Sequence, residues 1–158
     1  MLGAGRMLTA QALATCVLMA ANTYHVPAAV MIGIMHVEGG HVGQQAGPNM
    51  NGTYDLGPMQ VNTRWLPQLA QNWHVNDRTA RTWVRDDGCV NVHVAAWILR
   101  QKMEETGSIW GGIAAYHSAT PSVGGPYATK VIAVMDRKGL VKHDAPLYQY
   151  HPMKYAER

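Results

Sequence analysis

The spacing of apolar and polar residues along the chain predicts a mainly α-helical protein. Over Leu8–Asn22, apolar side chains recur every three or four residues, which is the spacing of one helix face. A second helix is expected after Pro27, because proline fits the first turn of a helix. It should end at Gly39-Gly40, where glycine can adopt the left-handed cap conformation. The chain therefore opens with two helices.

Residues 41–61 interrupt this helical pattern. They are rich in Gly, Asn and Pro, and they contain Asn51-Gly52, a dipeptide typical of hairpin turns. We therefore expect a small β-ribbon near residues 44–60.

The second half of the chain returns to helical spacing. The expected elements are a short helix over Trp65–Asn72, a short turn near Arg78–Arg85, a long helix over Val90–Thr106, a helix over Ile109–His117 and a last helix that Pro126 opens and that closes near Gly139. Residues 140–158 have no clear period and form a C-terminal extension of unassigned role. No internal repeat or linker is evident, so we expect one domain over 1–158 with its core in about residues 8–139.

The composition is that of a globular protein. Of the 158 residues, 47% are hydrophobic and 15% are charged, and no run of 18 apolar residues predicts a membrane span. The net charge is +3, and because the 13 Lys and Arg are scattered, we do not expect nucleic acid as a partner. A mild positive charge suits an acidic polymer such as the cell wall.

The N-terminal segment has two interpretations. An early Arg6 and a partly apolar run are features of a weak signal peptide. However, Thr9, Gln11 and Thr15 interrupt that run, and its helical period favours a helix of the domain. A leader removed from a longer precursor is compatible with this interpretation.

The stretch HVEGGH, residues 36–41, only superficially resembles a zinc-protease helix. That helix needs two histidines at i and i+4, with a glutamate directly after the first. Here the histidines are five positions apart (41 − 36), Val37 stands in the glutamate position, and two glycines break the helix between them. We therefore expect no metal site, and Glu38 is left as a candidate acid at a helix end.

The chain has two cysteines, Cys16 and Cys89. Two buried thiols and one disulfide are equally compatible with this count, and a disulfide would indicate an oxidising compartment.

Four short segments carry a family resemblance. They are Glu38-Gly39-Gly40, NGTYDLGPMQVNTRWL at residues 51–66, Cys89-Val90-Asn91, and Ala115-Tyr116-His117-Ser118. In this order and spacing they resemble the soluble lytic transglycosylases of the lysozyme superfamily, in particular the small specialised members that accompany conjugation, secretion and pilus machines. The resemblance extends over roughly residues 8–134.

The resemblance implies a lysozyme-like α+β fold and an enzyme that cleaves the β-1,4 bond between N-acetylmuramic acid and N-acetylglucosamine in peptidoglycan. It implies glycan strands as partners, components of such a machine as possible further partners, no cofactor, and a periplasmic or cell-envelope location. In similar proteins the cysteines equivalent to Cys16 and Cys89 are paired, so the resemblance favours a disulfide.

Glu38 is the expected catalytic acid. Cleavage of a glycosidic bond requires a proton on the leaving oxygen, and burial against apolar neighbours keeps a carboxyl group protonated near neutral pH. A carboxylate at the C-terminal end of a helix opposes the helix dipole, so this position gains nothing for stability. In the family the same glutamate then takes the proton of the muramic acid C6 hydroxyl, which closes a 1,6-anhydro ring.

Asp55 leaves two interpretations open. Its position two residues before Gly57 resembles the second catalytic carboxylate of the c-type lysozymes, and paired carboxylates are typical of retaining glycosidases. Alternatively, Asp55 only braces its turn through backbone N–H groups.

The resemblance also suggests contacts with substrate. Gln60 is expected to bind an N-acetyl or hydroxyl group, with Met59 as an apolar floor. Asn62 contacts a neighbouring sugar or caps the next helix. Tyr116 should pack near Glu38 and offer its hydroxyl to the sugar, whereas Tyr127 matches a family aromatic less securely and is more readily a core residue.

Three positions depart from the family pattern. Gly39 replaces serine, Pro58 replaces leucine, and His117 replaces the asparagine after the tyrosine. His117 places a titratable group in the expected cleft. The departures at Gly39 and His117 keep open a non-catalytic wall-binding or assembly protein, and Asp55 keeps open a hydrolytic muramidase that uses Glu38 and Asp55.

Overall fold

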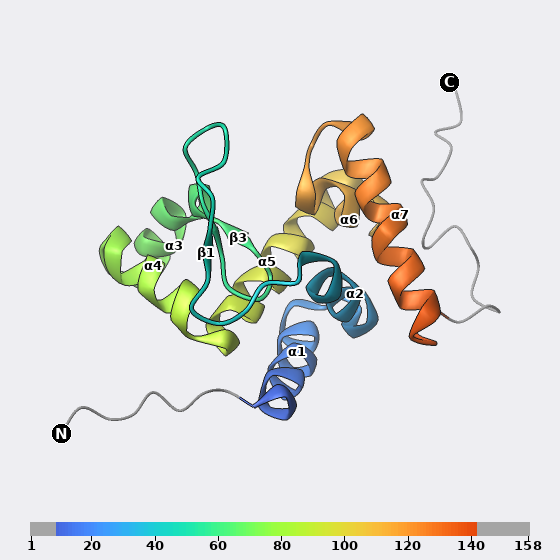
Figure 1. Cartoon of the computed structure of the whole chain (residues 1–158), viewed down its shortest axis with the longest axis horizontal. Helices are drawn as coiled ribbons and strands as arrows, with labels where there is room; N and C mark the ends of the chain where they lie inside the picture. Colours follow the sequence, from blue (N-terminus) through green and yellow to red (C-terminus); the bar gives the residue numbers. More distant parts are fainter. Residues whose placement is uncertain (1–8, 142–158) are drawn as a thin grey trace.

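The computed structural model describes residues 9–141, and over that range the chain forms seven α-helices, one 3-10 helix and a small sheet (Figure 1). The helices are α1 (Ala10–Tyr24), α2 (Ala28–Glu38), α3 (Leu66–Trp73), α4 (Asp77–Asp86), α5 (Gly88–Thr106), α6 (Ile109–His117) and α7 (Pro121–Arg137), with the 3-10 helix η1 at Thr63–Trp65. The strands are β1 (Gln45–Ala46), β2 (Asp55–Leu56) and β3 (Val61–Asn62). Leu8, the expected start of the first helix, and residues 142–158 of the expected extension lie outside the described residues.

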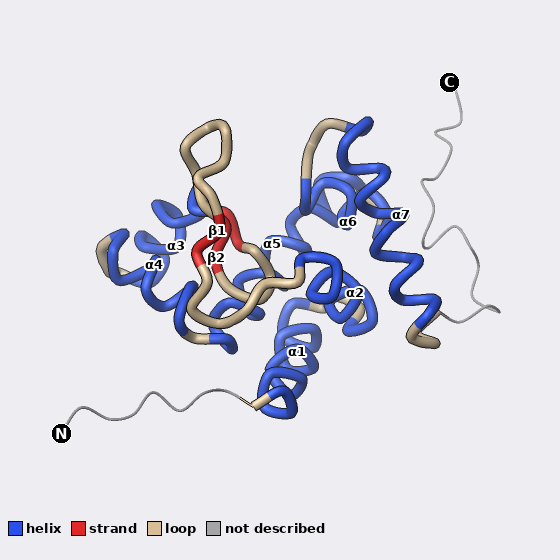
Figure 2. Tube along the Cα trace, in the orientation of Figure 1, coloured by secondary structure: helices blue, strands red, loops and turns tan. Residues whose placement is uncertain are grey.

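Helix α5 runs through the middle of the molecule. The sheet, α3 and α4 lie on one side of it, and α6 and α7 lie on the other, as the tube in Figure 2 also shows. The α5 side chains that make the centre of the core are almost fully buried: Val92, Val94, Ala95, Ala96, Ile98 and Leu99. The predicted mainly α, lysozyme-like architecture with a small antiparallel ribbon is thereby confirmed.

The β-ribbon has three very short antiparallel strands in the order β1-β2-β3. Leu56 stands opposite Gln45 on one side and Val61 on the other, and both Leu56 and Val61 are buried in the core. The predicted Asn51-Gly52 turn lies at the tip, where the Gly52 N–H donates to the Asn49 carbonyl at 2.8 Å. The ribbon reaches residue 62, two residues beyond the expected end.

Two helices are longer than the sequence pattern predicted. The expected short turn near residues 78–85 is the ten-residue helix α4, which begins because the Asn76 side chain accepts a hydrogen bond from the Thr79 N–H at 2.8 Å. Helix α5 begins at Gly88 rather than Val90, because Asp87 caps it by accepting from the Val90 N–H at 3.0 Å. Polar cap residues therefore set both starts.

The predicted start of the last helix was wrong. Helix α7 begins at Pro121, and Pro126 lies inside it. Proline suits the first helical position, and the residue before Pro126 is Gly125, which has no Cβ to collide with the proline ring. The first turn also packs tightly on α6, because a Cβ on Gly124 would lie only 2.6 Å from the carbonyl oxygens of Ala114 and Ser118.

The predicted disulfide is present. Cys16 of α1 and Cys89 of α5 are bonded, and their Cα atoms are 5.3 Å apart. The bond joins positions 73 residues apart and ties the first helix to the central one. Constraining a loop of this length in the unfolded chain is worth roughly 4 kcal/mol in the chain-entropy model.

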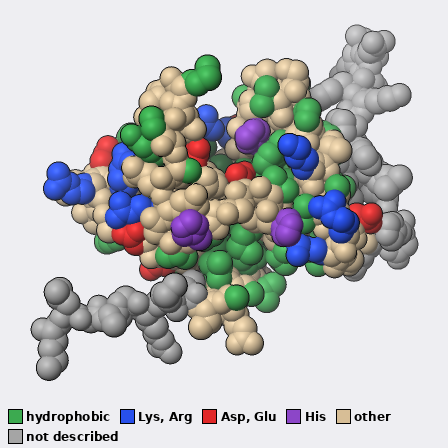
Figure 3. Space-filling model, in the orientation of Figure 1, with side chains coloured by type: hydrophobic (Ala, Val, Ile, Leu, Met, Phe, Trp, Pro, Cys, Tyr) green, Lys and Arg blue, Asp and Glu red, His purple; other side chains and the backbone are tan. Residues whose placement is uncertain are grey.

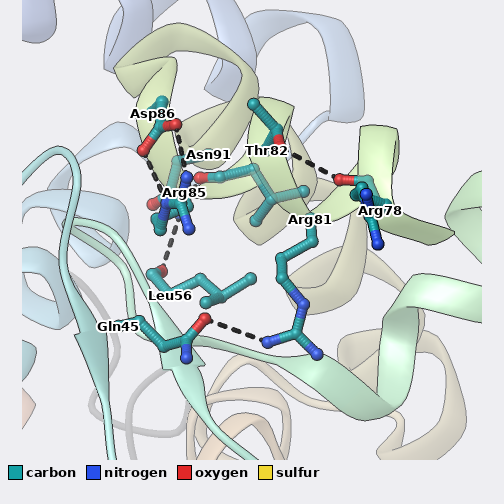
Figure 4. Close-up of polar contacts among 9 residues, drawn as sticks. Gln45, Leu56, Arg78, Arg81, Thr82, Arg85, Asp86 and Asn91 are labelled. Atoms are coloured by element: carbon teal, nitrogen blue, oxygen red, sulfur yellow. Dashed lines mark hydrogen bonds and ion pairs between the residues drawn. The ribbon is translucent and has the colours of Figure 1, made fainter.

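A single buried asparagine joins the ribbon to the helices. Asn91 of α5 is fully buried, and its Nδ2 donates to the carbonyl oxygen of Leu56 at 2.8 Å (Figure 4). The same nitrogen donates to the carbonyl oxygen of Val84 at 2.9 Å. Its Oδ1 accepts from the Met59 N–H at 2.9 Å. One side chain thus satisfies three backbone groups from strand β2, helix α4 and the turn that follows β2.

A second contact between the ribbon and the helices is at the surface. The Arg81 guanidinium of α4 donates to the Gln45 side-chain oxygen at 2.9 Å, as Figure 4 shows. Exposed contacts of this kind contribute little to stability, so the buried amide of Asn91 is the stronger of the two connections.

We predict that Asn91→Ala is strongly destabilising. The substitution leaves three backbone groups without partners, and each is expected to cost about 1–3 kcal/mol if it stays buried. Asn72→Ala, at an exposed position of α3, is the matched control and should change stability by less than about 0.5 kcal/mol. Urea unfolding measures both, and equal stability of the two variants would contradict the role assigned to Asn91.

Candidate active site

Glu38 is the last residue of α2. The helix ends here because Gly39 takes a left-handed conformation, with φ of 61°, and its N–H donates to the Met35 carbonyl at 3.1 Å. The Glu38 side chain is partly buried and lies at the wall of a cleft.

Gly40 brings the end of α2 against the β-ribbon. A Cβ at this position would collide with the Gly57 carbonyl oxygen and would lie 2.6 Å from the Gln60 Nε2. In the structure, the space beside Gly40 is filled by the turn that carries Gln60, so this glycine sets the distance between the acid and the ribbon.

Tyr127 of α7 holds the Glu38 carboxyl group. Its hydroxyl donates to Glu38 Oε1 at 2.6 Å. The two helices approach closely because Gly33 of α2 faces α7: a Cβ there would lie 2.8 Å from Met135 and 3.0 Å from Val131. The Tyr127 ring is buried as expected for a core aromatic, and its polar tip also reaches the candidate acid.

Burial raises the pKa of Glu38 to about 7. The Tyr127 hydrogen bond acts in the opposite direction and lowers this pKa, because it stabilises the carboxylate. The negative charge of Asp55 raises it further. A carboxyl group with this pKa can give or take a proton near neutral pH.

Asp55 of β2 stands in a polar network rather than an apolar one. Its Oδ2 accepts from the Asn49 Nδ2 and its Oδ1 from the Asn62 Nδ2, both at 2.9 Å. The same two amide groups donate to the Thr53 hydroxyl, at 3.1 and 2.9 Å. Side-chain amides, rather than the backbone N–H groups of the bracing alternative, hold the carboxylate in place at the cleft.

Asn62 has the capping role that was weighed for it, and its contact with a neighbouring sugar stays a prediction. Its Oδ1 accepts from the Arg64 N–H at 3.0 Å and so caps η1, while its amide nitrogen is used by Asp55 and Thr53. It also lines the cleft.

The turn Gly57–Gln60 reaches the cleft through Gln60. The Met59 side chain is fully buried, so it lies beneath the cleft surface rather than forming that surface. The Met59 carbonyl accepts a hydrogen bond from the Tyr116 hydroxyl at 2.9 Å. The hydroxyl proton of Tyr116 is therefore used in this bond and is not offered to a sugar. Gln60 lines the cleft in a left-handed conformation, with φ of 49°, and its amide donates to the Gly57 carbonyl at 2.9 Å.

His117 lies flat on the ring of Tyr127. The ring centres are 4.5 Å apart and the planes are inclined by 6°. His117 is exposed and lines the cleft, and partial burial lowers its pKa below the ordinary value. This departure from the family pattern therefore supports the tyrosine that holds Glu38.

The cleft has a volume of about 460 Å³ and lies between the β-ribbon and α6. Figure 3 shows acidic side-chain atoms inside the hollow at this place. The structure brings Glu38, Asp55, Gln60, Asn62, Tyr116 and His117 to its wall. Met59 and Tyr127 act from behind the wall, through the contacts described above.

Sequence reasoning did not single out Asn49 or Thr53, and it used Asn91 only as part of a motif. Asn49 and Thr53 flank the Asn51-Gly52 turn, so composition marks them as turn residues and gives no sign that they support Asp55. Asn91 lies among apolar residues of α5, where a lone amide signals a buried hydrogen-bonded role.

The histidines of HVEGGH point to no common site. His36 and His41 are both exposed and are separated by the left-handed Gly39. Within residues 9–141, no group of three or more His, Cys, Asp and Glu side chains is arranged to hold a metal ion.

A mainly α fold, a small antiparallel ribbon and a cleft with an acid at its wall define a lysozyme-like protein. A family model for the transglycosylase SLT domain matches residues 15–128, which is more than half of the chain. The protein therefore belongs to this family of peptidoglycan lytic transglycosylases, which cleave glycosidic bonds. None of the curated proteins compared with the chain matches it significantly.

Membership of this family implies peptidoglycan as substrate and suggests a location outside the cytoplasm. A disulfide fits an oxidising compartment. No helix within residues 9–141 is sufficiently long and apolar to cross a membrane.

Two substitutions should move the pKa of Glu38 in opposite directions. Tyr127→Phe removes the donor that stabilises the carboxylate, so the pKa should rise above about 7, whereas Asp55→Asn removes a negative charge and should lower it. The carboxyl ¹³C chemical shift, followed against pH, measures both. Tyr24→Phe, at the end of α1, is the control and should leave the Glu38 titration unchanged. Shifts of the same sign in the two cleft variants would contradict this electrostatic assignment.

Proposed function

We propose that this protein cleaves the β-1,4 bond between N-acetylmuramic acid and N-acetylglucosamine and releases a 1,6-anhydro product, with Glu38 as acid and then as base. The observation that carries the proposal is the state of Glu38: its partly buried carboxyl group lies at the cleft and has a pKa raised to about 7. Family membership supplies the substrate class.

In the first step, protonated Glu38 gives its proton to the glycosidic oxygen as the C1–O bond breaks. Tyr127 occupies Oε1, which leaves the other carboxyl oxygen to face the leaving group. Positive charge develops on the muramic acid ring, and the substrate N-acetyl group stabilises it in this family. Cleavage depends on the acid form, so activity should fall as the pH rises through about 7.

In the second step, Glu38 is a carboxylate in a partly buried site, which makes it a good base. It takes the proton of the C6 hydroxyl while the C6 oxygen bonds to C1, and the acid form is regenerated. Gln60, at the cleft wall, is the residue we assign to an N-acetyl or hydroxyl group of the sugar, with Asn62 near the adjoining sugar.

Asp55 supports a second candidate, a hydrolytic muramidase. The two amide donors fix its carboxylate at the same cleft as Glu38, and its charge acts on Glu38. A fixed carboxylate can stabilise the developing cation or form a glycosyl intermediate that water then cleaves. We assign Asp55 to stabilisation of the cation, with the 1,6-anhydro product as the main outcome.

We further propose that cleavage serves local remodelling of the wall in the periplasm, during assembly of an envelope-spanning machine. The supporting observations are the four motifs shared with the small specialised transglycosylases and the disulfide between Cys16 and Cys89. Components of a secretion, conjugation or pilus machine are the partners that this role requires.

Glu38→Gln tests the enzyme assignment. The amide keeps the shape of the side chain but cannot give a proton to the leaving oxygen, so the rate of wall lysis should fall about 10²–10⁴-fold while binding to purified walls survives. Glu104→Gln, at an exposed position of α5, is the matched control and should keep full activity. Full lysis by Glu38→Gln would show that another residue is the acid. Wall binding without lysis by the unmodified protein would favour a non-catalytic role.

Asp55→Asn and the product masses separate the two candidate reactions. If Asp55 stabilises the cation, its loss should lower the rate about 10²-fold or more, and Asp77→Asn on α4 should have no such effect. Mass spectrometry of the wild-type digest should show 1,6-anhydro sugars, which are one water lighter than hydrolysis products. Reducing-end products alone would identify a muramidase. A modest rate loss with lower thermal stability would reduce Asp55 to a bracing role.

A further inference from the structure

The cleft contains one strongly basic side chain. Among its lining residues, Arg64 is the only Lys or Arg, and it shares the cleft with Glu38 and Asp55. Arg64 is exposed. Within residues 9–141, the ion pairs of the structure involve Arg85, Arg100 and Lys102, so Arg64 has no carboxylate partner there.

The backbone of Arg64 is fixed relative to the candidate catalytic residues. Its N–H donates to Asn62 Oδ1 at 3.0 Å, and the amide nitrogen of the same Asn62 donates to Asp55. Asn62 therefore connects the backbone of Arg64 to the hydrogen bonds of Asp55. Arg64 belongs to the 3-10 helix η1 and not to a long loop.

The side chain of Arg64 is supported by an aromatic ring. Its guanidinium carbon lies 5.6 Å from the centre of the Trp65 ring, a cation–π distance. Trp65 in turn meets Trp97 edge to face, with ring centres 5.5 Å apart. The ammonium of Lys102 lies equally close to Trp65 but is paired with Glu105 at 2.8 Å, so the unpaired charge belongs to Arg64.

We infer that Arg64 is a binding site for a carboxylate carried by the glycan strand. This inference rests on the proposed function, because it concerns the substrate of the same cleft. The strand offers two sources of carboxylate: the lactyl group of muramic acid where no peptide is attached, and the acidic groups of the peptide stems. A guanidinium presents a planar fork of donors that matches a carboxylate.

The arrangement has a consequence for specificity. With Glu38 in its acid form, Asp55 brings negative charge into the cleft, which opposes an anionic strand. Arg64 offsets this repulsion and favours strands that carry carboxylates over neutral glycans. Because Arg64 would bind a part of the strand that does not react, its contribution should appear in KM rather than kcat.

Steady-state cleavage by Arg64→Gln tests the site. On soluble glycan strands with native carboxylates, KM should rise about 10-fold while kcat changes little, as expected for loss of one charge-assisted contact. On the same strands with every carboxyl group converted to a neutral methylamide, Arg64→Gln and wild type should have equal KM values. Arg64→Glu should raise KM further on native strands only. Arg78→Gln, at an exposed position of α4, is the matched control.

One further substrate, a strand stripped of its peptides by an amidase, identifies the source of the carboxylate. Removal of the peptides leaves the lactyl group as the only carboxylate of the strand, so a KM effect that persists on stripped strands shows that Arg64 binds the lactyl carboxylate. If it disappears on stripped strands, the ligand is in the peptide stems. A KM increase of equal size on native and neutralised strands would overturn the inference, because it would reflect damage to the cleft instead of a lost charge. Absence of cleavage of any strand by the wild type would instead reject the proposed function.

Discussion

The side-chain amide of Asn91 is the connection on which the active-site geometry depends. It leaves the central helix and satisfies the carbonyls of Leu56 and Val84 and the N–H of Met59, none of which can reach water. An amide has one acceptor and two donor hydrogens, so this residue type can make all three bonds at once. The Tyr116 hydroxyl also holds this turn, because it donates a hydrogen bond to the Met59 carbonyl. Hydrogen bonds from α5 and α6 therefore hold the ribbon side of the cleft in place. The short strands alone would be too small to do so.

The two carboxyl groups of the cleft, Glu38 and Asp55, have different surroundings. Glu38 comes from an apolar helix end, where burial raises its pKa to about 7, and Tyr127 limits that rise by donating to it. Asp55 comes from the ribbon and is surrounded by amide donors. The close packing of α2 on α7 at Gly33 places Tyr127 beside the acid, and His117 stacks on the ring of that tyrosine. In the proposed mechanism, Glu38 is the acid and Asp55 the fixed carboxylate beside it.

Much of the fold could be predicted from the sequence. Apolar spacing and terminal glycines located the helices, and Asn51-Gly52 located the ribbon, because these signals act over a few neighbouring residues. The last helix was misplaced because two prolines, Pro121 and Pro126, were both acceptable starts by local rules. The packing of Gly124 on α6 decided between them, and a contact of that kind has no local signature. Helices α4 and α5 began earlier than expected because their asparagine and aspartate caps outweighed weak apolar periodicity.

By itself, the sequence determined the helical architecture, the position of an acid at the end of α2 and, through four motifs, the family of the protein. Only the tertiary structure decided what each polar side chain does. Tyr116 holds a backbone turn, Tyr127 reaches Glu38 from α7, and Asn49 supports Asp55. The physical reason is that these bonds join residues whose distance is set by the packing of helices: Tyr127 and Glu38 are 89 positions apart, and Tyr116 and Met59 are 57 apart. Propensity and periodicity describe a residue and its neighbours, whereas a hydrogen bond of 2.6 Å requires the whole core to be in place.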